Sequence, residues 1–154
     1  PVQTFDEAPF SKKIQKALKA AGFTSPSPIQ AQSWPIAVAG QDLVAVAKTG
    51  SGKTLGFLLP AFRMIAETAG EEGASTGSSP ATPLVLVLAP TRELATQIEA
   101  ECTKFGKAAK VTSQAVFGGT PKGPQVKALK EGPQVLVATP GRLQDLMEMN
   151  AVSL

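Results

Sequence analysis

The segment Ala47–Thr54, with the sequence AKTGSGKT, constrains this chain more than any other feature. It follows an apolar run, Leu43–Val46, and a second apolar stretch begins at Leu55. A short strand, a glycine-rich turn and Gly-Lys-Thr at the start of a helix together form a phosphate-binding loop. Glycines let the backbone approach the phosphates, and a helix amino terminus presents free N–H groups to an anion. The pattern therefore predicts a site for a nucleoside triphosphate.

Individual residues of this loop have predicted roles. Lys53 is expected to reach the outer phosphates, and Thr54 to offer its hydroxyl to Mg²⁺. Ala47 stands where the general P-loop pattern begins with glycine, so an ordinary glycine–serine turn is the alternative. The apolar segments on both sides favour the phosphate-binding loop. The predicted nucleotide contacts are Ala47, Lys48, Thr49, Gly50, Ser51, Gly52, Lys53 and Thr54.

Composition excludes several kinds of chemistry. The 154 residues include no histidine and one cysteine, Cys102. Zinc sites, histidine-based catalysis and internal disulfides are therefore not expected, and a reducing compartment fits. Cys102 lies in a predicted helix and is interpreted as a packing residue. The net charge of +3 suits a polyanionic partner, and no apolar run approaches the roughly 20 residues of a membrane span.

Apolar runs and helical patterns alternate along the chain. This alternation predicts an α/β fold with a mainly parallel sheet flanked by helices and right-handed crossovers. Strands are predicted at 43–47, 84–89, 111–117 and 134–138. Helices are predicted from Ser11 to Gly22, at 29–38, 53–66, 91–105 and 125–130, and from Thr139 onward.

The predicted strands all end in polar motifs. These are Lys48–Thr54, Pro90–Glu93, Gly118-Gly119 and Thr139–Arg142, and ligands of parallel sheets gather at that edge. The segment 69–83, AGEEGASTGSSPATP, is predicted to be a flexible loop inside a single domain, without a function of its own.

Glutamine, arginine and glycine residues in or near these motifs have the chemistry to bind a nucleotide or a polyanion. Gln30 carries a donor and an acceptor that match adenine, unless it is a polar residue on a solvent-facing helix surface. Arg92 and Arg142 begin predicted helices, where a cation is disfavoured unless an anion binds there. A surface arginine paired with Glu93 or another neighbour is the alternative for Arg92, and Arg142 has the same alternative; a simple turn is the alternative for Gly118-Gly119.

The motifs and their order resemble the first of the two RecA-like domains of DEAD-box RNA helicases. Residues 22–30, GFTSPSPIQ, resemble the Q motif, and Ala47–Thr54 resemble motif I, where this family itself uses alanine. Residues 90–95, PTRELA, resemble motif Ia, and 139–142, TPGR, resemble motif Ib, with Gly118-Gly119 as the GG motif. The resemblance covers nearly the whole chain. The amino-acid sequence around 31–53 and 118–125 is most similar to that of the nuclear p68-type group, including plant members.

The resemblance implies ATP and Mg²⁺ as ligands and RNA as the partner, held by its sugar–phosphate backbone. Gln30 would select adenine and Phe5 would stack near the base; Phe5 could equally pin the N-terminal arm to the core. A second RecA-like domain would close on the first, bend the RNA and part a short duplex. We expect an intracellular protein without a membrane anchor, in the nucleus, the cytoplasm or an organelle. The implied RNA contacts are Pro90, Thr91, Arg92, Glu93, Gly118, Gly119, Thr139, Pro140, Gly141 and Arg142.

The chain lacks the Asp-Glu-Ala-Asp and Ser-Ala-Thr motifs of this family. Hydrolysis needs a carboxylate for Mg²⁺ and groups that position water. We therefore expect an incomplete RecA-like P-loop NTPase domain, spanning 1–154, that does not hydrolyse ATP alone. Because the strands that carry the missing motifs lie inside the sheet of this family, the chain alone is expected to be marginally stable, unless its missing portion lies elsewhere in the molecule. A truncated module that binds RNA or a partner without turnover is the alternative. An unrelated P-loop ATPase or kinase is disfavoured by Gln30.

Overall fold

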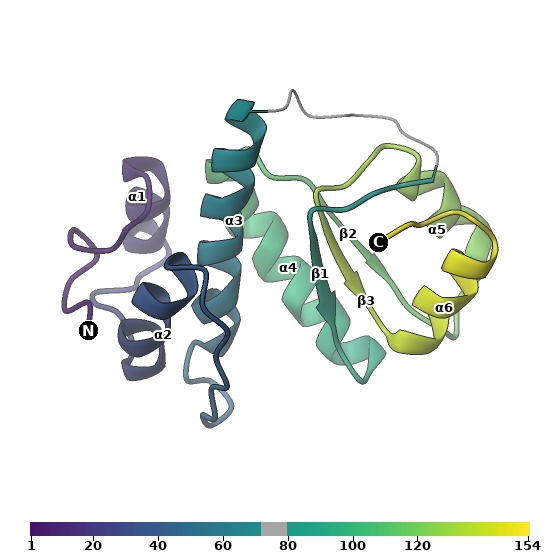
Figure 1. Ribbon diagram of the computed structural model, residues 1–154. Coiled ribbons are helices and arrows are strands. Elements are labelled where there is room, and N and C mark those ends of the chain that lie inside the picture. The colour runs from purple at the N-terminus through teal and green to yellow at the C-terminus, as the bar shows by residue number, and fades with distance from the viewer. Residues whose placement is uncertain (72–79) are drawn as a thin grey trace. The chain divides into compact units, whose positions relative to one another are not determined.

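The computed structural model describes the backbone of residues 1–71 and 80–154 and the side chains of residues 1–68 and 80–154. The described chain forms two compact units, residues 1–68 and 69–154 (Figure 1). The boundary coincides with the beginning of the predicted loop 69–83, of which residues 72–79 lie outside the described part.

The first unit contains helices α1 (Lys12–Ala20), α2 (Pro28–Val38) and most of α3 (Lys53–Glu71). The sequence specifies where they begin: the Ser11 hydroxyl accepts a hydrogen bond from the Ile14 amide, and Pro28 occupies the first turn of α2. The apolar faces of these helices form a buried core. Its largest members are Phe5, Leu18, Trp34, Leu58, Leu59 and Phe62.

The predicted strand at 43–47 is wrong. Residues 41–48 have neither helical nor strand structure, and the side chains of Val44 and Val46 are 94% and 92% exposed. A strand exists only when its N–H and C=O groups pair with a neighbouring strand. In the described part of the chain this segment has no such partner. The apolar run indicates that the segment suits a buried strand, but it cannot supply the neighbouring strand that the pairing requires.

The second unit is a three-stranded parallel sheet with helices between the strands. Its elements are β1 (Val85–Leu88), α4 (Arg92–Ala109), β2 (Ser113–Val116), α5 (Lys122–Leu129), β3 (Val135–Ala138) and α6 (Pro140–Glu148). The strand order is β1-β3-β2. The chain therefore moves across the sheet in one direction through α4 and back through α5. Helix α4 covers one face of the sheet and α5 the other, where α6 also lies (Figure 1); this is the arrangement expected of right-handed crossovers that run in opposite directions.

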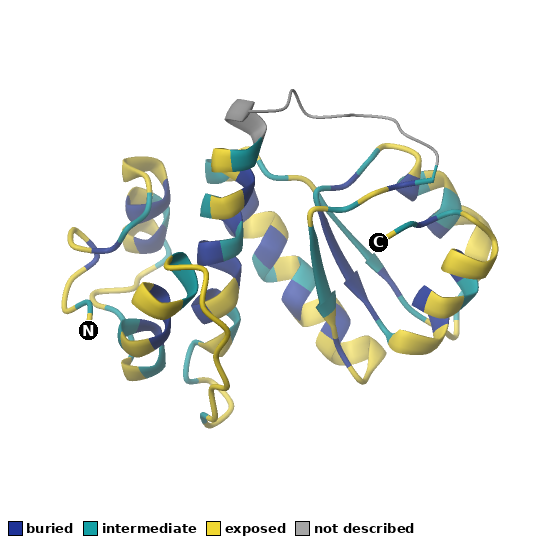
Figure 2. Cartoon of the chain, in the orientation of Figure 1, coloured by how far each residue is buried: buried dark blue, intermediate teal, exposed yellow. Residues whose placement is uncertain are grey.

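The central strand β3 is the centre of this unit, and all four of its residues are buried (Figure 2). Leu136 and Ala138 belong to a core cluster with residues of α5 and α6. Because side chains alternate between the faces of a strand, Val135 and Val137 face α4. The apolar face of α4 consists of Ala95, Ile98, Cys102 and Phe105, all buried.

Several element bounds differ from the prediction. Helix α3 continues to Glu71, so the first residues of the predicted loop 69–83 are helical. At the other end of that loop, buried Ala81 pairs with Val152 in an isolated parallel bridge. Helix α5 begins at Lys122 rather than Gln125, because Pro124 is tolerated in a first turn, where its missing N–H would have no acceptor. No helix in the described ranges is long and apolar enough to cross a membrane.

Candidate functional site

The segment Ala47–Thr54 turns sharply into α3. Gly50 and Gly52 have φ angles of +79° and +86°, which other residues rarely adopt. The Ser51 amide donates to the Lys48 carbonyl at 3.2 Å, which closes the turn. The Gly56 amide donates to the Gly52 carbonyl at 3.1 Å. The amides of the first helical turn have no acceptor one turn earlier, so they can donate to an anion.

Two side chains of this loop are consistent with phosphate binding. The Ser51 hydroxyl is buried and has no hydrogen-bond partner within the described structure. A buried polar atom left without a partner costs free energy, which a phosphate oxygen would remove. The Lys53 ammonium lies back over the loop and donates to the Ala47 carbonyl at 2.6 Å. Thr54 follows within the first turn of α3. The predicted nucleotide-binding residues of the loop are therefore brought together around one turn.

Gln30 connects the Q-motif segment to this loop. Its side-chain nitrogen donates to the Gly52 carbonyl at 3.2 Å, and its side-chain oxygen accepts from the Ser27 amide at 3.0 Å. The side chain is buried, which excludes a solvent-facing position. A glutamine amide has two hydrogens and two acceptor positions, so one of each is left for an adenine edge. Selection of adenine by Gln30 stays a prediction.

Replacing Gly52 with alanine is expected to lower both the stability of the chain and its affinity for ATP. The new Cβ would lie 2.5 Å from the Gln30 side-chain nitrogen and 3.0 Å from the Ser27 hydroxyl. We expect the left-handed backbone to cost about 1–2 kcal/mol and the contact with Gln30 to add to this. Gly40→Ala is the matched control, since Gly40 has φ +73° but open space around it. Urea unfolding and ATP titration of both variants measure the difference; equal effects would contradict a role for the Gln30 contact.

Phe5 pins the N-terminal arm to the core of the first unit. It is buried, and its ring centroid lies 6.3 Å from that of Trp34. Trp34 in turn donates from its indole nitrogen to the Leu55 carbonyl in the first turn of α3, at 3.1 Å. The alternative role that the sequence left open for Phe5 is thus observed. Stacking of Phe5 near a base stays a prediction.

In the second unit, the three strand exits meet at one edge of the sheet. The Ala89 amide after β1 donates to the Ala138 carbonyl at 2.9 Å. The Thr139 amide after β3 donates to the Val116 carbonyl of β2 at 3.0 Å. The predicted RNA contacts at 90–93, 118–119 and 139–142 follow these exits, as predicted. The fourth predicted exit, Lys48–Thr54, belongs to the first unit and does not follow a strand.

Arg92 extends from the start of α4 to the turn after β2. Thr91 caps α4, since its hydroxyl accepts from the Leu94 amide at 3.2 Å. The Arg92 guanidinium lies 5.0 Å from the centre of the Phe117 ring, a cation–π contact. Arg92 is exposed and lies over Phe117, and no ion pair with Glu93 is recorded among the described residues. Its guanidinium can therefore contact a phosphate from an ordered position.

Arg142 differs from Arg92 because its guanidinium is buried. It donates to the Gln125 side-chain oxygen at 3.1 Å and to the Thr120 carbonyl at 2.9 Å. Its Nε lies 3.9 Å from a carboxylate oxygen of Asp145, too far for a hydrogen bond. A contact between Arg142 and RNA stays a prediction, and in this arrangement the side chain holds protein groups.

Sequence reasoning missed Gln125 and Phe117 as neighbours of the predicted RNA site. The side-chain nitrogen of Gln125 donates to the Phe117 carbonyl at 3.1 Å and to the Thr120 hydroxyl at 2.9 Å. An aromatic residue directly before two glycines was a readable signal for Phe117. Gln125 had no local signal, because its partners are 5, 8 and 17 residues away along the chain.

Cys102 is buried on α4, as expected for a packing residue. Burial raises the pKa of its thiol, and the neighbouring Glu99 carboxylate raises it further, while a hydrogen bond with Ser113 lowers it. The thiolate is therefore disfavoured at neutral pH, which argues against a nucleophile.

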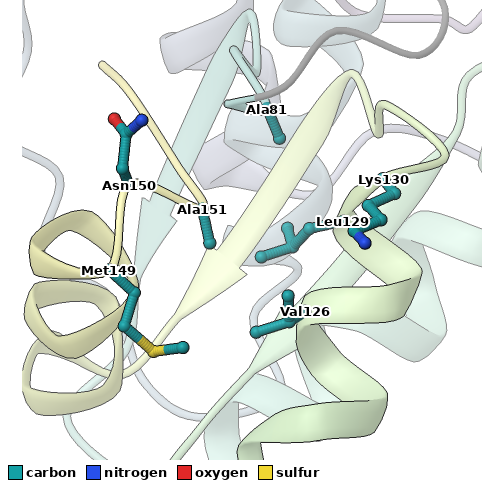
Figure 3. A pocket seen from close by; sticks show the side chains of 7 residues that line it. All are labelled: Ala81, Val126, Leu129, Lys130, Met149, Asn150 and Ala151. Atoms are coloured by element: carbon teal, nitrogen blue, oxygen red, sulfur yellow. The ribbon is translucent and has the colours of Figure 1, made fainter.

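The second unit also has a cavity of about 160 Å³, whose lining residues are shown in Figure 3. It is near the carboxyl ends of α5 and α6, whereas the predicted contacts follow the carboxyl ends of the strands. None of the predicted site residues lines it. The lining residues are Ala81, Val126, Leu129, Lys130, Met149, Asn150 and Ala151.

Curated relatives match the chain along its whole length. It is 51% identical to the ATP-dependent RNA helicase-like protein DB10 of Nicotiana sylvestris and 53% identical to the DEAD-box ATP-dependent RNA helicase 40 of Oryza sativa subsp. japonica, over all 154 residues. It is 48% identical to the ATP-dependent RNA helicase dbp2 of Schizosaccharomyces pombe. The chain spans only 24%, 19% and 27% of the lengths of these relatives.

Solved structures share the fold. The RNA helicase Prp28 from Chaetomium thermophilum, bound to ADP, superposes with a TM-score of 0.82 at 38% identity, covering 97% of this chain and 35% of that one. A hypothetical ATP-dependent RNA helicase from Sulfolobus tokodaii gives a TM-score of 0.77 at 29% identity, covering 92% and 38%. The predicted fold class, an incomplete RecA-like domain with a parallel sheet flanked by helices, is confirmed.

The sequence model of the DEAD/DEAH box helicase family matches residues 27–154. This range begins within the Q-motif segment and includes the predicted phosphate-binding loop and all three strand exits of the second unit. The family resemblance indicated by those motifs is confirmed, and the chain belongs to the DEAD/DEAH box helicase family.

Proposed function

We propose that this chain is the ATP- and RNA-binding portion of an ATP-dependent RNA helicase that remodels or locally unwinds RNA. The observation that carries the proposal is the bond between Gln30 and Gly52. This hydrogen bond directly connects two segments: the one predicted to recognise the adenine base and the loop predicted to hold the phosphates. An ordinary glycine–serine turn has no need of this connection.

The loop residues would hold the nucleotide. Lys53 would exchange the Ala47 carbonyl for phosphate oxygens, since a charge-assisted bond to an anion is stronger than one to a neutral carbonyl. The first-turn amides of α3 and the Ser51 hydroxyl would donate to the same phosphates. Thr54 would offer its hydroxyl to Mg²⁺. ATP supplies a phosphoanhydride bond whose cleavage can drive a conformational cycle. The ADP in the Prp28 structure supports nucleotide binding by this fold.

The strand exits of the second unit would hold RNA by its backbone. Arg92 offers a charged fork, and Gly118, Gly119 and Gly141 offer exposed backbone that carries no side chain of its own. Contacts of this kind carry no base information, so binding should be sensitive to salt and tolerant of sequence. The RNA-helicase names of the relatives support this partner.

Turnover would require parts that this chain does not contain. The 154 residues lack the Asp-Glu-Ala-Asp motif, whose carboxylates would hold Mg²⁺, and a second RecA-like domain. We infer that the 154-residue chain binds ATP without hydrolysing it and that the whole protein closes two such domains on RNA. A non-catalytic module that binds RNA or a partner is the alternative. Turnover by a whole protein containing this chain distinguishes the two.

Calorimetric titration of the 154-residue chain with Mg²⁺–ATP and Mg²⁺–GTP tests the nucleotide site. Binding of ATP in preference to GTP is expected, because Gln30 matches the adenine edge. Equal affinities would favour the unrelated P-loop ATPase or kinase. Titration with single-stranded RNA at several salt concentrations tests the second site. RNA-stimulated phosphate release by this chain, abolished by Lys53→Ala, would contradict the inferred lack of turnover.

A further inference from the structure

We propose that Gln125 is a positioning residue of the predicted RNA site: its amide bonds the turn Phe117–Thr120 and the Arg142 guanidinium directly, and through that turn it orders Arg92. The proposal rests on the proposed function, because it concerns how the RNA-contacting edge is held. Gln125 lies in α5 and is buried. It is therefore not itself exposed to a large ligand, and its effect would pass through the residues that it contacts.

The hydrogen-bond chemistry of this cluster requires an amide at position 125. Its nitrogen faces the Phe117 carbonyl, which only accepts, and its oxygen faces the Arg142 guanidinium, which only donates. Both requirements fix the same orientation of the amide. A carboxylate would lack the donor, an amine would lack the acceptor, and an apolar side chain would lack both.

Gln125 and Arg142 together anchor both ends of the turn. Gln125 bonds the Phe117 carbonyl at one end and the Thr120 hydroxyl at the other, and Arg142 bonds the Thr120 carbonyl. Between these anchors are Gly118 and Gly119, and Gly119 has a φ angle of +80°. Two glycines in sequence have many accessible conformations, so an unanchored turn would have to be ordered when RNA binds. The anchors impose that order beforehand.

The same turn orders Arg92. The Phe117 ring lies under the guanidinium, with its centre 5.0 Å away. Arg92 is otherwise exposed at the start of α4, where a long side chain has many rotamers. Because Gln125 fixes the Phe117 carbonyl, it also limits where the attached ring can lie. Loss of this bond would therefore release Arg92 without any change in Arg92 itself.

The substitution Gln125→Glu separates the two functions of the amide. It keeps the length of the side chain and an oxygen for Arg142, but places a carboxylate oxygen against the Phe117 carbonyl. Gln144→Glu is the matched control: it makes the same chemical change at an exposed position of α6. Both variants are made in the 154-residue chain, and their affinity for a single-stranded uridine oligonucleotide is measured at several salt concentrations.

We expect Gln125→Glu to weaken RNA binding about 3- to 10-fold more than Gln144→Glu, as for the loss of one ordered hydrogen bond. We also expect the plot of log affinity against log salt concentration to become less steep by about 0.7, because the released Arg92 no longer contacts its phosphate reliably. A residue that only stabilised the fold would leave this slope unchanged.

NMR order parameters without RNA give a second measurement. The order parameters of the Gly118 and Gly119 amides should be lower in Gln125→Glu and unchanged in Gln144→Glu, with those of β3 high in both. If Gln125→Glu does not fold, Thr120→Val, which removes the hydroxyl that accepts from Gln125, should show the same changes to a smaller extent. Order parameters in the turn equal to those of the control would overturn the proposal. If the parent chain does not bind RNA, the proposed function fails, while the order parameters still decide whether Gln125 holds the turn.

Discussion

Replacement of Lys53 by alanine is expected to lower the affinity of the chain for Mg²⁺–ATP by about 10- to 100-fold. Hydrogen bonds to charged groups contribute about 1.5–3 kcal/mol, and each 1.4 kcal/mol changes an affinity tenfold. The ammonium is near the loop, bonded to the Ala47 carbonyl at 2.6 Å, so a small rotation brings it to a bound phosphate. Calorimetric titration of both proteins with Mg²⁺–ATP measures the change.

Lys16→Ala is the matched control for this experiment. Lys16 lies in α1 of the same unit, is exposed and has no ion pair recorded in the described structure, so its loss changes net charge alone. The bond between Lys53 and Ala47 is exposed, so Lys53→Ala should leave the free energy of unfolding nearly unchanged. If Lys53→Ala and Lys16→Ala bound ATP equally well, the assignment of Ala47–Thr54 as a phosphate-binding loop would be wrong.

The substitution Trp34→Ala is expected to lower the free energy of unfolding by about 3–5 kcal/mol. Trp34 is fully buried, and its ring packs edge-on against Phe10, with centroids 5.0 Å apart, and obliquely against Phe5. Alanine would leave a large cavity and would remove the donor for the Leu55 carbonyl. Urea unfolding followed by circular dichroism measures the loss; fluorescence is unsuitable, because Trp34 is the one tryptophan of the sequence.

Trp34→Phe separates packing from hydrogen bonding. It keeps an aromatic ring between Phe5 and Phe10 but removes the indole donor to the Leu55 carbonyl, which should cost about 0.5–1.5 kcal/mol for the loss of one hydrogen bond. Because this bond joins α2 to the first turn of α3, ATP affinity should also fall in Trp34→Phe under conditions where the protein is folded. A loss below about 1 kcal/mol for Trp34→Ala would contradict the central place of Trp34 in this core.

Local sequence predicted those elements whose signals are local. The helices predicted from Ser11 and from Thr91 are capped by those residues, and the helix predicted from Thr139 begins with Pro140; α2 begins at Pro28, one residue before the predicted start. The apolar runs at 84–89 and 134–138 form parallel strands. The equally apolar run at 43–47 does not, because pairing depends on a neighbour that no local pattern can provide.

The same division applies to the candidate site. The pattern of glycines, Lys53 and Thr54 that predicts a phosphate-binding loop was readable because it lies in one continuous segment. The positions of Gln30 against Gly52 and of Arg92 over Phe117 were not, since 22 residues separate the first pair and the second spans a helix and a strand. Arg142 was predicted to contact RNA, yet its guanidinium is buried with Gln125 and Thr120.

The sequence by itself determined the family and the order of helices and strands in the second unit, and it predicted the phosphate-binding loop, because short segments carry those signals. Tertiary structure alone decided which polar groups are partners of one another. It placed the Gln30 amide on the loop, the Arg92 guanidinium over an aromatic ring and the Gln125 amide between a carbonyl and a guanidinium. The physical reason is that periodicity and capping depend on neighbours along the chain, whereas the partner of a buried donor or acceptor depends on which distant segments the fold brings within hydrogen-bond distance.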